Sequence, residues 1–508
     1  MQTSFKSGVG DLFKNNLSNL KISFSKISNF LNKELSAKNA FLLLFILYSL
    51  ALLSILRENI SYRDDIGRTA YGFSGWLDFS RYTTEYLSKL IHAGSYVSDI
   101  SPIPQIIAII ELSLASIFLL KCITGKKTYN LWQIVATIPL ALNPYFLECL
   151  SFKFDSPYMA LSILVAVVPV LFIKHFYFFI TTTVISTVII CTSYQASIGI
   201  LPMVTVFSLL TMYINGETLK NLFKTAFYFA IAFLAGAIIF KTLILQPTVR
   251  DYVSIDIAPF DILPNLFVKN MAIYYSDLFS KSGFIGSSAI CKKTSIITTV
   301  VMLIVCVFNS KNNKLLTLLL AALSLTLGAI LTYGFYACLE KPLFIPRTLY
   351  GIGVLLACIF TIAVSYKEFF IAKICSVILG WSLIVTASSY GNALAAQKNW
   401  EKFRAEEVVI DLASIDHGKK KYKVEGNCGL TPSLSYLTID KPIFKRLIPQ
   451  TLGQEFWFWN EPQLSYAYGI SELTYDNEIT DKGTPLSVRE TKYHTIKVFE
   501  DKLIIKLK

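Results

Sequence analysis

The stretch NAFLLLFILYSLALLSILRENISYRDDIGRTAYGFSGW, residues 39–76, joins a long apolar run to a loop rich in charged residues. An apolar run of about 20 residues is long enough to cross a bilayer as a helix. The run ends near Arg57, and two adjacent carboxylates, Asp64 and Asp65, follow it. The stretch therefore predicts a first membrane span with an acidic loop at its edge.

The composition of the whole chain is that of a membrane protein. Of its 508 residues, 54% are hydrophobic and only 16% are charged, which is too apolar for an ordinary water-soluble domain. The formal net charge is +13, but the lysines mostly flank apolar segments, where positive residues set orientation and contact anionic lipid. We therefore expect membrane lipid as a partner and no nucleic acid.

Apolar runs long enough to span the bilayer recur along the chain, and short basic connections fall on alternate turns, on the side of the basic N-terminus. Positive residues favour the cytoplasmic side, so this alternation predicts a cytoplasmic N-terminus and an exterior C-terminus. About eleven spans are predicted, at residues 39–57, 103–120, 131–149, 156–173, 176–193, 197–214, 225–245, 294–308, 315–336, 348–364 and 371–390.

The polar parts of the chain complete the predicted organisation. The basic, partly apolar N-terminal segment is typical of an amphipathic helix on the membrane surface, the alternative being a disordered basic tail. The mixed C-terminal segment suffices for a small α/β domain and ends in an alternating pattern around Asp501 that predicts a hairpin. The predicted parts are residues 1–38, a transmembrane catalytic domain at 39–390 with exterior loops 58–102, 246–293 and 337–347, and an exterior domain at 391–508.

Unusual polar residues gather at the exterior ends of several spans, in the motifs SFKFDSP, TSYQAS and ACLEKPLFIPR. Polar backbone at membrane depth is tolerated where protein buries it or where it lines a cavity. These loops are therefore predicted to form one site with the acidic loop. The residues concerned are Lys153, Asp155, Tyr194, Gln195, Glu340, Lys341 and Arg347.

Two charged residues among these segments have alternative interpretations. Pro346 and Arg347 are predicted to open a helix, whose free N–H groups and guanidinium would suit a phosphate. The alternative is that Arg347 is an interface anchor. Glu111 lies within the second predicted span, where a charge is costly, so it is either functional or a hydrogen-bonded structural group.

The Asp64–Asp65 pair is flanked by Arg63 and Arg68. Adjacent carboxylates raise each other's proton affinity unless a cation separates them. One of them can then stay ionised as a base while the other pairs with an arginine. The alternative is an ordinary helix cap or solvated turn.

The ordered motifs YRDDIGRTAYGFSGW, FKFDSP and SYQAS, together with the exterior C-terminal domain, resemble the serotype-converting O-antigen glucosyltransferases, the Gtr or glucosyl transferase II family of enteric bacteria and their phages. That family is similar in plan to the GT-C glycosyltransferases. The resemblance implies a polytopic α-helical, GT-C-like protein of the bacterial inner membrane, with about eleven transmembrane helices and a C-terminal periplasmic α/β domain.

The resemblance also implies an activity. It is inverting transfer of glucose from undecaprenyl-phosphate glucose to a sugar hydroxyl of the O-antigen repeat of lipopolysaccharide, at the periplasmic face, which gives serotype conversion. Functional partners would make and flip the lipid-linked glucose. The acid of the first exterior loop that acts as base in this family falls on Asp64 or Asp65, and the sequence does not choose between them.

The other candidate residues fit this chemistry in supporting roles. The leaving lipid phosphate needs positive charge, and the donor-phosphate candidates are Arg347, Lys341, Arg68 and Lys153. Tyr194, Gln195 and Arg63 are candidates for sugar or phosphate contact, with packing at the membrane interface as the alternative for Tyr194 and Gln195. Trp457 and Trp459 offer rings on which an acceptor sugar can stack, or they belong to the core of the small domain.

No cofactor is required by this chemistry, although a divalent cation is possible. Asp155 and Glu340, with the aspartate pair, are its candidate ligands. The nine cysteines show no CxxC spacing, so they indicate neither a zinc site nor a redox pair.

Two other functions compete with glucosyl transfer. A transporter or flippase for a lipid-linked sugar also has many spans, but such proteins tend to contain inverted repeats, and this chain shows no internal repeat. An O-antigen polymerase or ligase also has many spans and large exterior loops. The gathering of polar residues at one face also argues against the transporter, and the acid in the first exterior loop favours the glucosyltransferase over the polymerase or ligase.

Overall fold

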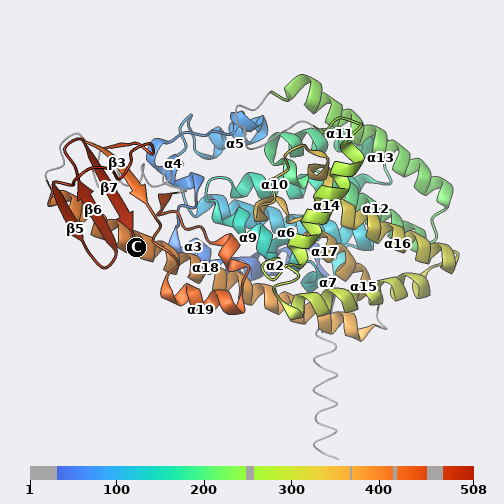
Figure 1. Ribbon diagram of the computed structural model, residues 1–508. Helices are drawn as coiled ribbons and strands as arrows, with labels where there is room; N and C mark the ends of the chain where they lie inside the picture. Colours follow the sequence, from blue (N-terminus) through green and yellow to red (C-terminus); the bar gives the residue numbers. More distant parts are fainter. Residues whose placement is uncertain (1–30, 247–256, 367–368, 416–419, 455–472) are drawn as a thin grey trace, which may run out of the picture.

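The computed structural model describes residues 31–246, 257–366, 369–415, 420–454 and 473–508. The chain forms a helical bundle with a small β-sheet at one end (Figure 1). Most of the predicted N-terminal helix, residues 1–30, lies outside the described residues, as do Trp457 and Trp459.

The chain is a membrane protein with seven helices, among its described residues, that are long and apolar enough to cross a bilayer. A bent pair of helical segments adds an eighth if it is counted as one span. The seven are α6 (Ile103–Thr124), α11 (Phe176–Ser193), η3 with α12 (Gln195–Ile214), α13 with η4 (Leu219–Ile244), α15 (Ala289–Asn309), α16 (Lys314–Leu331) and α18 (Phe370–Ala413).

Each of the eleven predicted spans coincides with helical structure, but the count of eleven is not confirmed. Three of the apolar helices are short, and α17 is buried along its whole length, so its length need not match a bilayer. The short helices are α2 (Ala37–Ala51), α10 with η2 (Ser156–Phe172) and α17 (Gly351–Val364).

The bent pair has a local cause at Asn143 and Pro144. It consists of α7 (Leu131–Ala136) and α8 (Ile138–Leu142), followed at an angle of 59° by α9 (Pro144–Ser151). Proline cannot donate to the preceding turn, and the Asn143 side chain caps the new helix by accepting the N–H of Phe146 at 3.0 Å. The bend turns α9 into the part of the molecule where the predicted site residues gather.

The predicted exterior loops contain short helices of their own. The remaining elements of the bundle and its connections are α3 (Leu53–Glu58), α4 (Asp64–Tyr71), η1 (Leu77–Phe79), α5 (Tyr82–Ile91), α14 (Leu263–Phe279), η5 (Gly334–Cys338), η6 (Pro346–Thr348), α19 (Pro432–Asp440), α20 (Phe444–Leu447) and the short antiparallel strands β1 (Leu35–Ser36) and β2 (Thr128–Tyr129).

The C-terminal sheet has five strands in the order β4-β3-β7-β6-β5. The predicted hairpin around Asp501 is confirmed, because β6 and β7 pair antiparallel on either side of it. β3 pairs parallel with both β7 and β4. The strands are β3 (Lys421–Glu425), β4 (Thr474–Tyr475), β5 (Ser487–Glu490), β6 (His494–Val498) and β7 (Lys502–Leu507).

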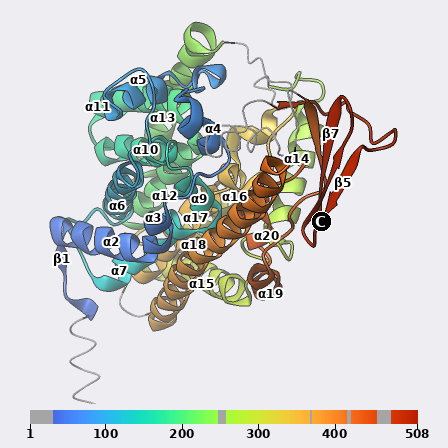
Figure 2. The ribbon, with the colours of Figure 1, turned by 90° about the vertical axis from the view of Figure 1, so that its left-hand side faces the viewer.

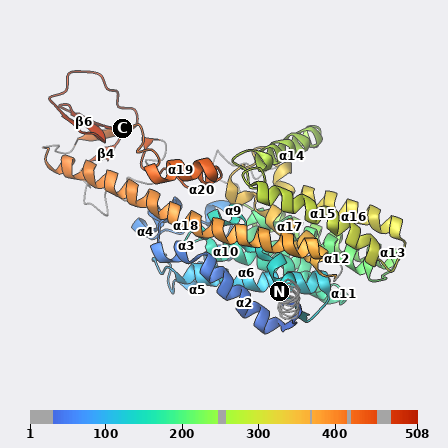
Figure 3. The same ribbon diagram turned by 90° about the horizontal axis from the view of Figure 1, so that it is seen from below.

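Helix α18 joins the bundle to the sheet without interruption at residue 391. It crosses the bundle diagonally when seen from the sheet end (Figure 2), and from below its far end reaches the sheet (Figure 3). Ala405, Val408 and Leu412 of this far end are buried in one core with side chains of the sheet, including Val424 and Ile505. The second half of α18 is therefore part of the sheet domain.

Gly391 allows α18 to pack closely on α3, the helix that leads into the acidic loop. A Cβ atom at this position would lie 2.2 Å from Ser54 Oγ and 2.8 Å from Ile55 N. Overpacking of this kind costs about 1–3 kcal/mol, so Gly391→Ala is expected to lower the melting temperature of the purified protein by several degrees.

Gly94→Ala is the matched control, because a Cβ there would approach no atom nearer than 3.8 Å. Equal melting temperatures for the two variants would show that the contact between α18 and α3 is not tight.

Candidate active site

The two adjacent carboxylates of the acidic loop lie in opposite environments. Asp64 and Asp65 begin α4, where acidic residues are favoured by the positive end of the helix dipole. Asp64 is exposed to solvent, whereas Asp65 has no exposed surface. The pair therefore offers one accessible carboxylate and one enclosed carboxylate.

Asp65 is held by the backbone of two segments. Its Oδ2 atom accepts the N–H of Tyr62 at 3.1 Å and the N–H of Lys153 at 2.9 Å. Its Oδ1 atom lies 3.9 Å from Arg68 Nη1 and makes no hydrogen bond within the described residues. Asp65 thus ties the acidic loop to the predicted SFKFDSP motif.

The burial of Asp65 changes its protonation. Burial, reinforced by the nearby charge of Asp155, raises the pKa of Asp65 to about 8, although Arg68 and the two backbone N–H groups oppose the shift. The Asp65 carboxyl group is therefore mostly protonated at neutral pH.

Arg68 and Asp155 form a buried ion pair behind Asp65. Arg68 Nη1 donates to Asp155 Oδ2, and Trp76 Nε1 donates to Asp155 Oδ1 at 2.5 Å. The Arg68 guanidinium also lies 4.8 Å from the centre of the Trp76 ring. Arg68 and Asp155 are thus brought together, and the charge of Arg68 is neutralised by Asp155 inside the protein.

Lys153 is also paired within the protein. Its ammonium group lies 2.5 Å from Asp99 Oδ2 and 3.4 Å from Asn59 Oδ1, and its side chain is only 2% exposed. Its backbone N–H, which binds Asp65, is the group that contributes to the site.

Glu148 is the main residue of the site that the sequence reasoning missed. It lies in α9, is completely buried, and its carboxylate accepts hydrogen bonds from Arg347 N at 2.7 Å, Arg347 Nη1 at 3.3 Å and Tyr62 Oη at 3.3 Å. Arg63 Nη1 lies 3.7 Å away. A signal was available, because an acid inside a predicted span is functional or paired by default. Glu148, like Glu111, lies inside a predicted span and meets this condition.

Arg347 is therefore bound differently from the prediction. It lies in the short helix η6, and its backbone N–H is taken by Glu148, so it is not free to bind an anion. Burial opposes ionisation, but the carboxylates of Glu148 and Asp64 raise the pKa of Arg347 overall. The side chain remains 23% exposed, which leaves part of a fixed guanidinium open to a ligand.

Tyr194 and Gln195 lie beside Arg347. The Tyr194 hydroxyl donates to the Arg347 carbonyl at 3.0 Å. Gln195 donates to the Phe79 carbonyl at 3.0 Å and accepts from Arg81 Nε at 3.3 Å. The predicted TSYQAS motif is thus part of the cluster, and it brings Arg81, which was not selected as a site residue, into contact with it.

Other predicted residues are not brought into the cluster. Glu340 and Lys341 are exposed, and no hydrogen bond or ion pair within the described residues joins them to the cluster. Glu111 lies in α6 with its Oε2 atom buried and unbonded among the described residues. Trp457 and Trp459 lie outside those residues.

The candidate cation ligands do not form a metal-binding group either. Asp155 is paired with Arg68. Glu340 is exposed, and no hydrogen bond or ion pair among the described residues joins it to Asp155. Across the part of the chain that the structure describes, no three His, Cys, Asp or Glu side chains gather as metal ligands would.

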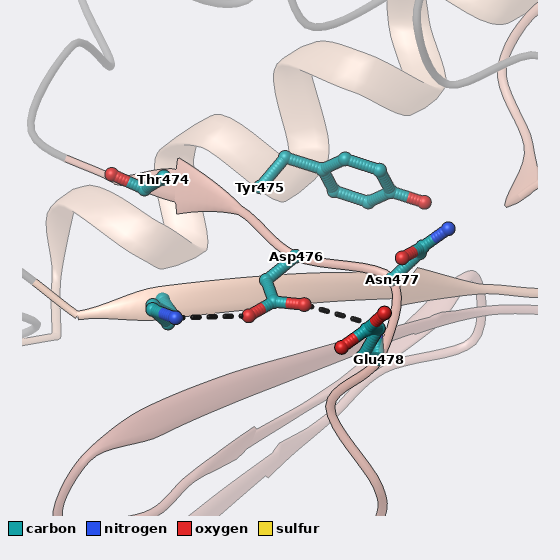
Figure 4. Close-up of a pocket in the computed structure, with 6 residues that line it drawn as sticks. Thr474, Tyr475, Asp476, Asn477 and Glu478 are labelled. Carbon is teal, nitrogen blue, oxygen red and sulfur yellow. Dashed lines mark hydrogen bonds and ion pairs between the residues drawn. The ribbon is translucent and has the colours of Figure 1, made fainter.

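A shallow pocket lies elsewhere, at the β4 edge of the C-terminal sheet (Figure 4). Lys421 Nζ lies 3.1 Å from Asp476 Oδ2, and the N–H of Glu478 donates to Asp476 Oδ1 at 3.0 Å. These exposed groups bind one another and include none of the residues around Asp64. We therefore take the cluster around Glu148 as the candidate active site.

Comparison with known proteins gives matches to this part of the chain. The model of the family Glucosyl transferase GtrII matches residues 53–358, a range that contains Asp64, Glu148 and Arg347. A Salmonella phage P22 protein, described as an uncharacterized 55.3 kDa protein in the gtrB 5′ region, is 26% identical over 484 residues, which cover 86% of this chain and 92% of that protein. No solved structure matches the chain.

The raised pKa of Asp65 predicts a pH dependence of stability. The pKa rises from 3.8 to about 8 on folding, so the folded protein holds a proton that the unfolded chain releases between these values. The contribution of this proton to the free energy of unfolding is fully present below about pH 4 and is lost as the pH rises towards about 8.

Asp65→Asn keeps the shape of the protonated group and removes the titration. Relative to this variant, the melting temperature of the wild type is expected to fall between about pH 5 and about pH 8. Parallel pH profiles of the two proteins would contradict a buried, protonated Asp65.

Proposed function

The chain belongs to the GtrII glucosyl transferase family, and we propose that it transfers glucose from undecaprenyl-phosphate glucose to a hydroxyl of the O-antigen repeat of lipopolysaccharide. The observation that carries this proposal is the exposed carboxylate of Asp64 beside partly exposed arginines, Arg63 and Arg347, that are fixed by one buried acid. A base for the acceptor and positive charge for a phosphate are the two groups that such a transfer needs.

Asp64 is the proposed general base. It takes the proton of the acceptor hydroxyl as that oxygen bonds to the anomeric carbon, on the face opposite the lipid phosphate, so the configuration inverts. The bond from the anomeric carbon to the phosphate oxygen breaks, and its electron pair leaves with the lipid phosphate. Arg347 stabilises the charge that develops on that phosphate.

The sequence left Asp64 and Asp65 as alternative bases, and Asp65 is the less suitable of the two. A base must come within hydrogen-bond reach of the hydroxyl, and Asp65 is enclosed by the protein. Its bonds to the backbone of Tyr62 and Lys153 suit a positioning role for the loop that carries Asp64.

We propose the GT-C-like topology with a cytoplasmic N-terminus and with the acidic loop and the C-terminal sheet domain both in the periplasm. The Tyr62 hydroxyl donates to the Leu447 carbonyl at 2.6 Å, and Arg446 Nη1 binds Asp277 at 2.6 and 2.7 Å. These contacts support a common side of the membrane for the acidic loop, the predicted loop 246–293 and the C-terminal segment. The inner membrane is the location where such a donor and acceptor meet.

The proposal is tested by transfer of radiolabelled glucose from undecaprenyl-phosphate glucose to O-antigen lipopolysaccharide by the purified protein. Asp64→Asn is expected to lower the turnover by about 100-fold to 10,000-fold, the usual effect of losing a general base, while donor binding persists.

Asp65→Asn is the matched control, and it is expected to retain most of the turnover because it imitates the protonated side chain. A wild type that transfers no glucose would refute the proposed function. Full activity of Asp64→Asn would refute its role as base.

A further inference from the structure

Arg81 is a half-buried arginine of the acidic loop and lies directly before α5. The mechanism above gives it no role. Its guanidinium lies 4.8 Å from the centre of the Tyr194 ring and 5.1 Å from that of Phe79. Its Nε atom donates to Gln195, whose amide is itself fixed by the Phe79 carbonyl. The guanidinium is thus held in place by two rings and one neutral amide.

The charge of Arg81 is not balanced by a carboxylate. Arg63 and Arg347 both lie within ion-pair distance of Glu148, and Arg68 pairs with Asp155. For Arg81, by contrast, no carboxylate of the described residues lies within that distance. A partly enclosed cation is stabilised by a counter-ion, and the described residues supply none for Arg81, so a bound anion would fill that role.

Arg81 and Arg347 face the same two tyrosines. The Tyr194 ring lies against Arg81, and its hydroxyl donates to the Arg347 carbonyl. Burial raises the pKa of Tyr336, and both Arg81 and Arg347 oppose this shift, so both charges act on that phenol as well. Tyr194 and Tyr336 therefore lie near both guanidinium groups, and the exposed Asp64 lies near that of Arg347.

The balance of charge in this region matches one phosphate diester. Arg63, Arg81 and Arg347 supply three positive charges, and Glu148 and Asp64 supply two negative ones. One positive charge remains, which equals the single negative charge of a phosphate esterified to both a lipid and a sugar. When the sugar is transferred, the released lipid phosphate gains negative charge. This charge strengthens its attraction to these arginines.

An apolar surface for a lipid chain begins at the same place. Phe335, the neighbour of Tyr336, is 44% exposed and stacks on Phe233 of α13 at 5.6 Å. Further exposed apolar side chains follow along α13, namely Ile231, Leu234 and Ile238. A phosphate at the two arginines can therefore extend its hydrocarbon chain along the membrane-facing side of this helix.

We infer that Arg81, together with Arg347, binds the phosphate of the polyprenyl-phosphate donor. This assignment rests on the proposed function for the identity of the donor, but binding of the lipid phosphate can be measured without any transfer. Of the other donor-phosphate candidates, Lys341 is exposed and makes no hydrogen bond or ion pair within the described residues, and Arg68 and Lys153 are paired within the protein.

The test is equilibrium binding of radiolabelled undecaprenyl phosphate to the purified full-length protein in detergent. Arg81→Gln is expected to weaken binding about tenfold or more, because it removes a charge-assisted contact. Arg81→Lys, which keeps the charge and loses the planar fork, is expected to weaken binding less. Lys89→Gln, which removes an exposed charge from α5, is the control and is expected to bind as the wild type does.

Competition separates the possible sources of the phosphate. Unlabelled undecaprenyl phosphate should displace the label, whereas undecaprenol, inorganic phosphate and phosphatidylglycerol should not at equal concentration. Wild-type affinity of Arg81→Gln would overturn the inference, as would equal competition by inorganic phosphate. If Arg81→Gln fails to fold, as judged by its melting temperature, the folded Arg81→Lys variant is used: binding that weakens as salt is raised supports a charge-based site, and binding that does not change with salt overturns it.

The two proposals fail in different ways. Arg81-dependent binding by a wild type that transfers no glucose would refute the proposed function and leave the phosphate site in place. Glucose transfer by the wild type with unchanged binding in Arg81→Gln would refute the phosphate site alone.

Discussion

The buried carboxylate of Glu148 holds together segments that are far apart in the sequence. It receives the backbone and guanidinium of Arg347 and the hydroxyl of Tyr62, with Arg63 close by. A carboxylate without water is stable only when cations and donors surround it. Because α9 carries this acid into the interior, η6 and the start of the acidic loop must converge on it. The position of Asp64 at the surface follows from that convergence.

A second buried group, Asp65 with Arg68 and Asp155, fixes the next residues of the same loop. The buried acids Glu148 and Asp65 thus hold the loop from inside the protein. The exposed carboxylate of Asp64 lies at the surface beside Arg63 and Arg347. The Tyr62 hydroxyl lies between Glu148 and the Leu447 carbonyl, so the C-terminal segment contacts this arrangement directly. Removal of residues 391–508 would therefore cut α18 within the helix and also withdraw a contact from the acidic loop.

The sequence predicted the features that depend on local pattern. Each predicted apolar run coincides with helical structure, and alternation marked the hairpin around Asp501, because hydrophobic periodicity reports burial directly. Convergence of the polar motifs was also predictable, and Asp65 does meet the backbone of Lys153. The number of spans was not, since three of the apolar helices are short and the bend at Asn143 divides another. The position of Glu148 inside a predicted span marked it as a functional or paired acid, but its partners come from segments whose contact only the folded chain reveals.

The melting temperatures and transfer rates of Glu148→Gln, Arg347→Gln and the double variant test most directly whether one buried carboxylate organises the site. Glu148→Gln leaves the Arg347 guanidinium without its carboxylate, and Arg347→Gln leaves the buried Glu148 with Arg63, at 3.7 Å, as its remaining cation among the described residues. Each is therefore expected to destabilise the protein by about 3 kcal/mol and to lower the transfer rate. The double variant should lose clearly less than the sum of the two single losses, since both remove one interaction. Single variants that melt and transfer as the wild type does, or losses that simply add, would contradict a site built on Glu148.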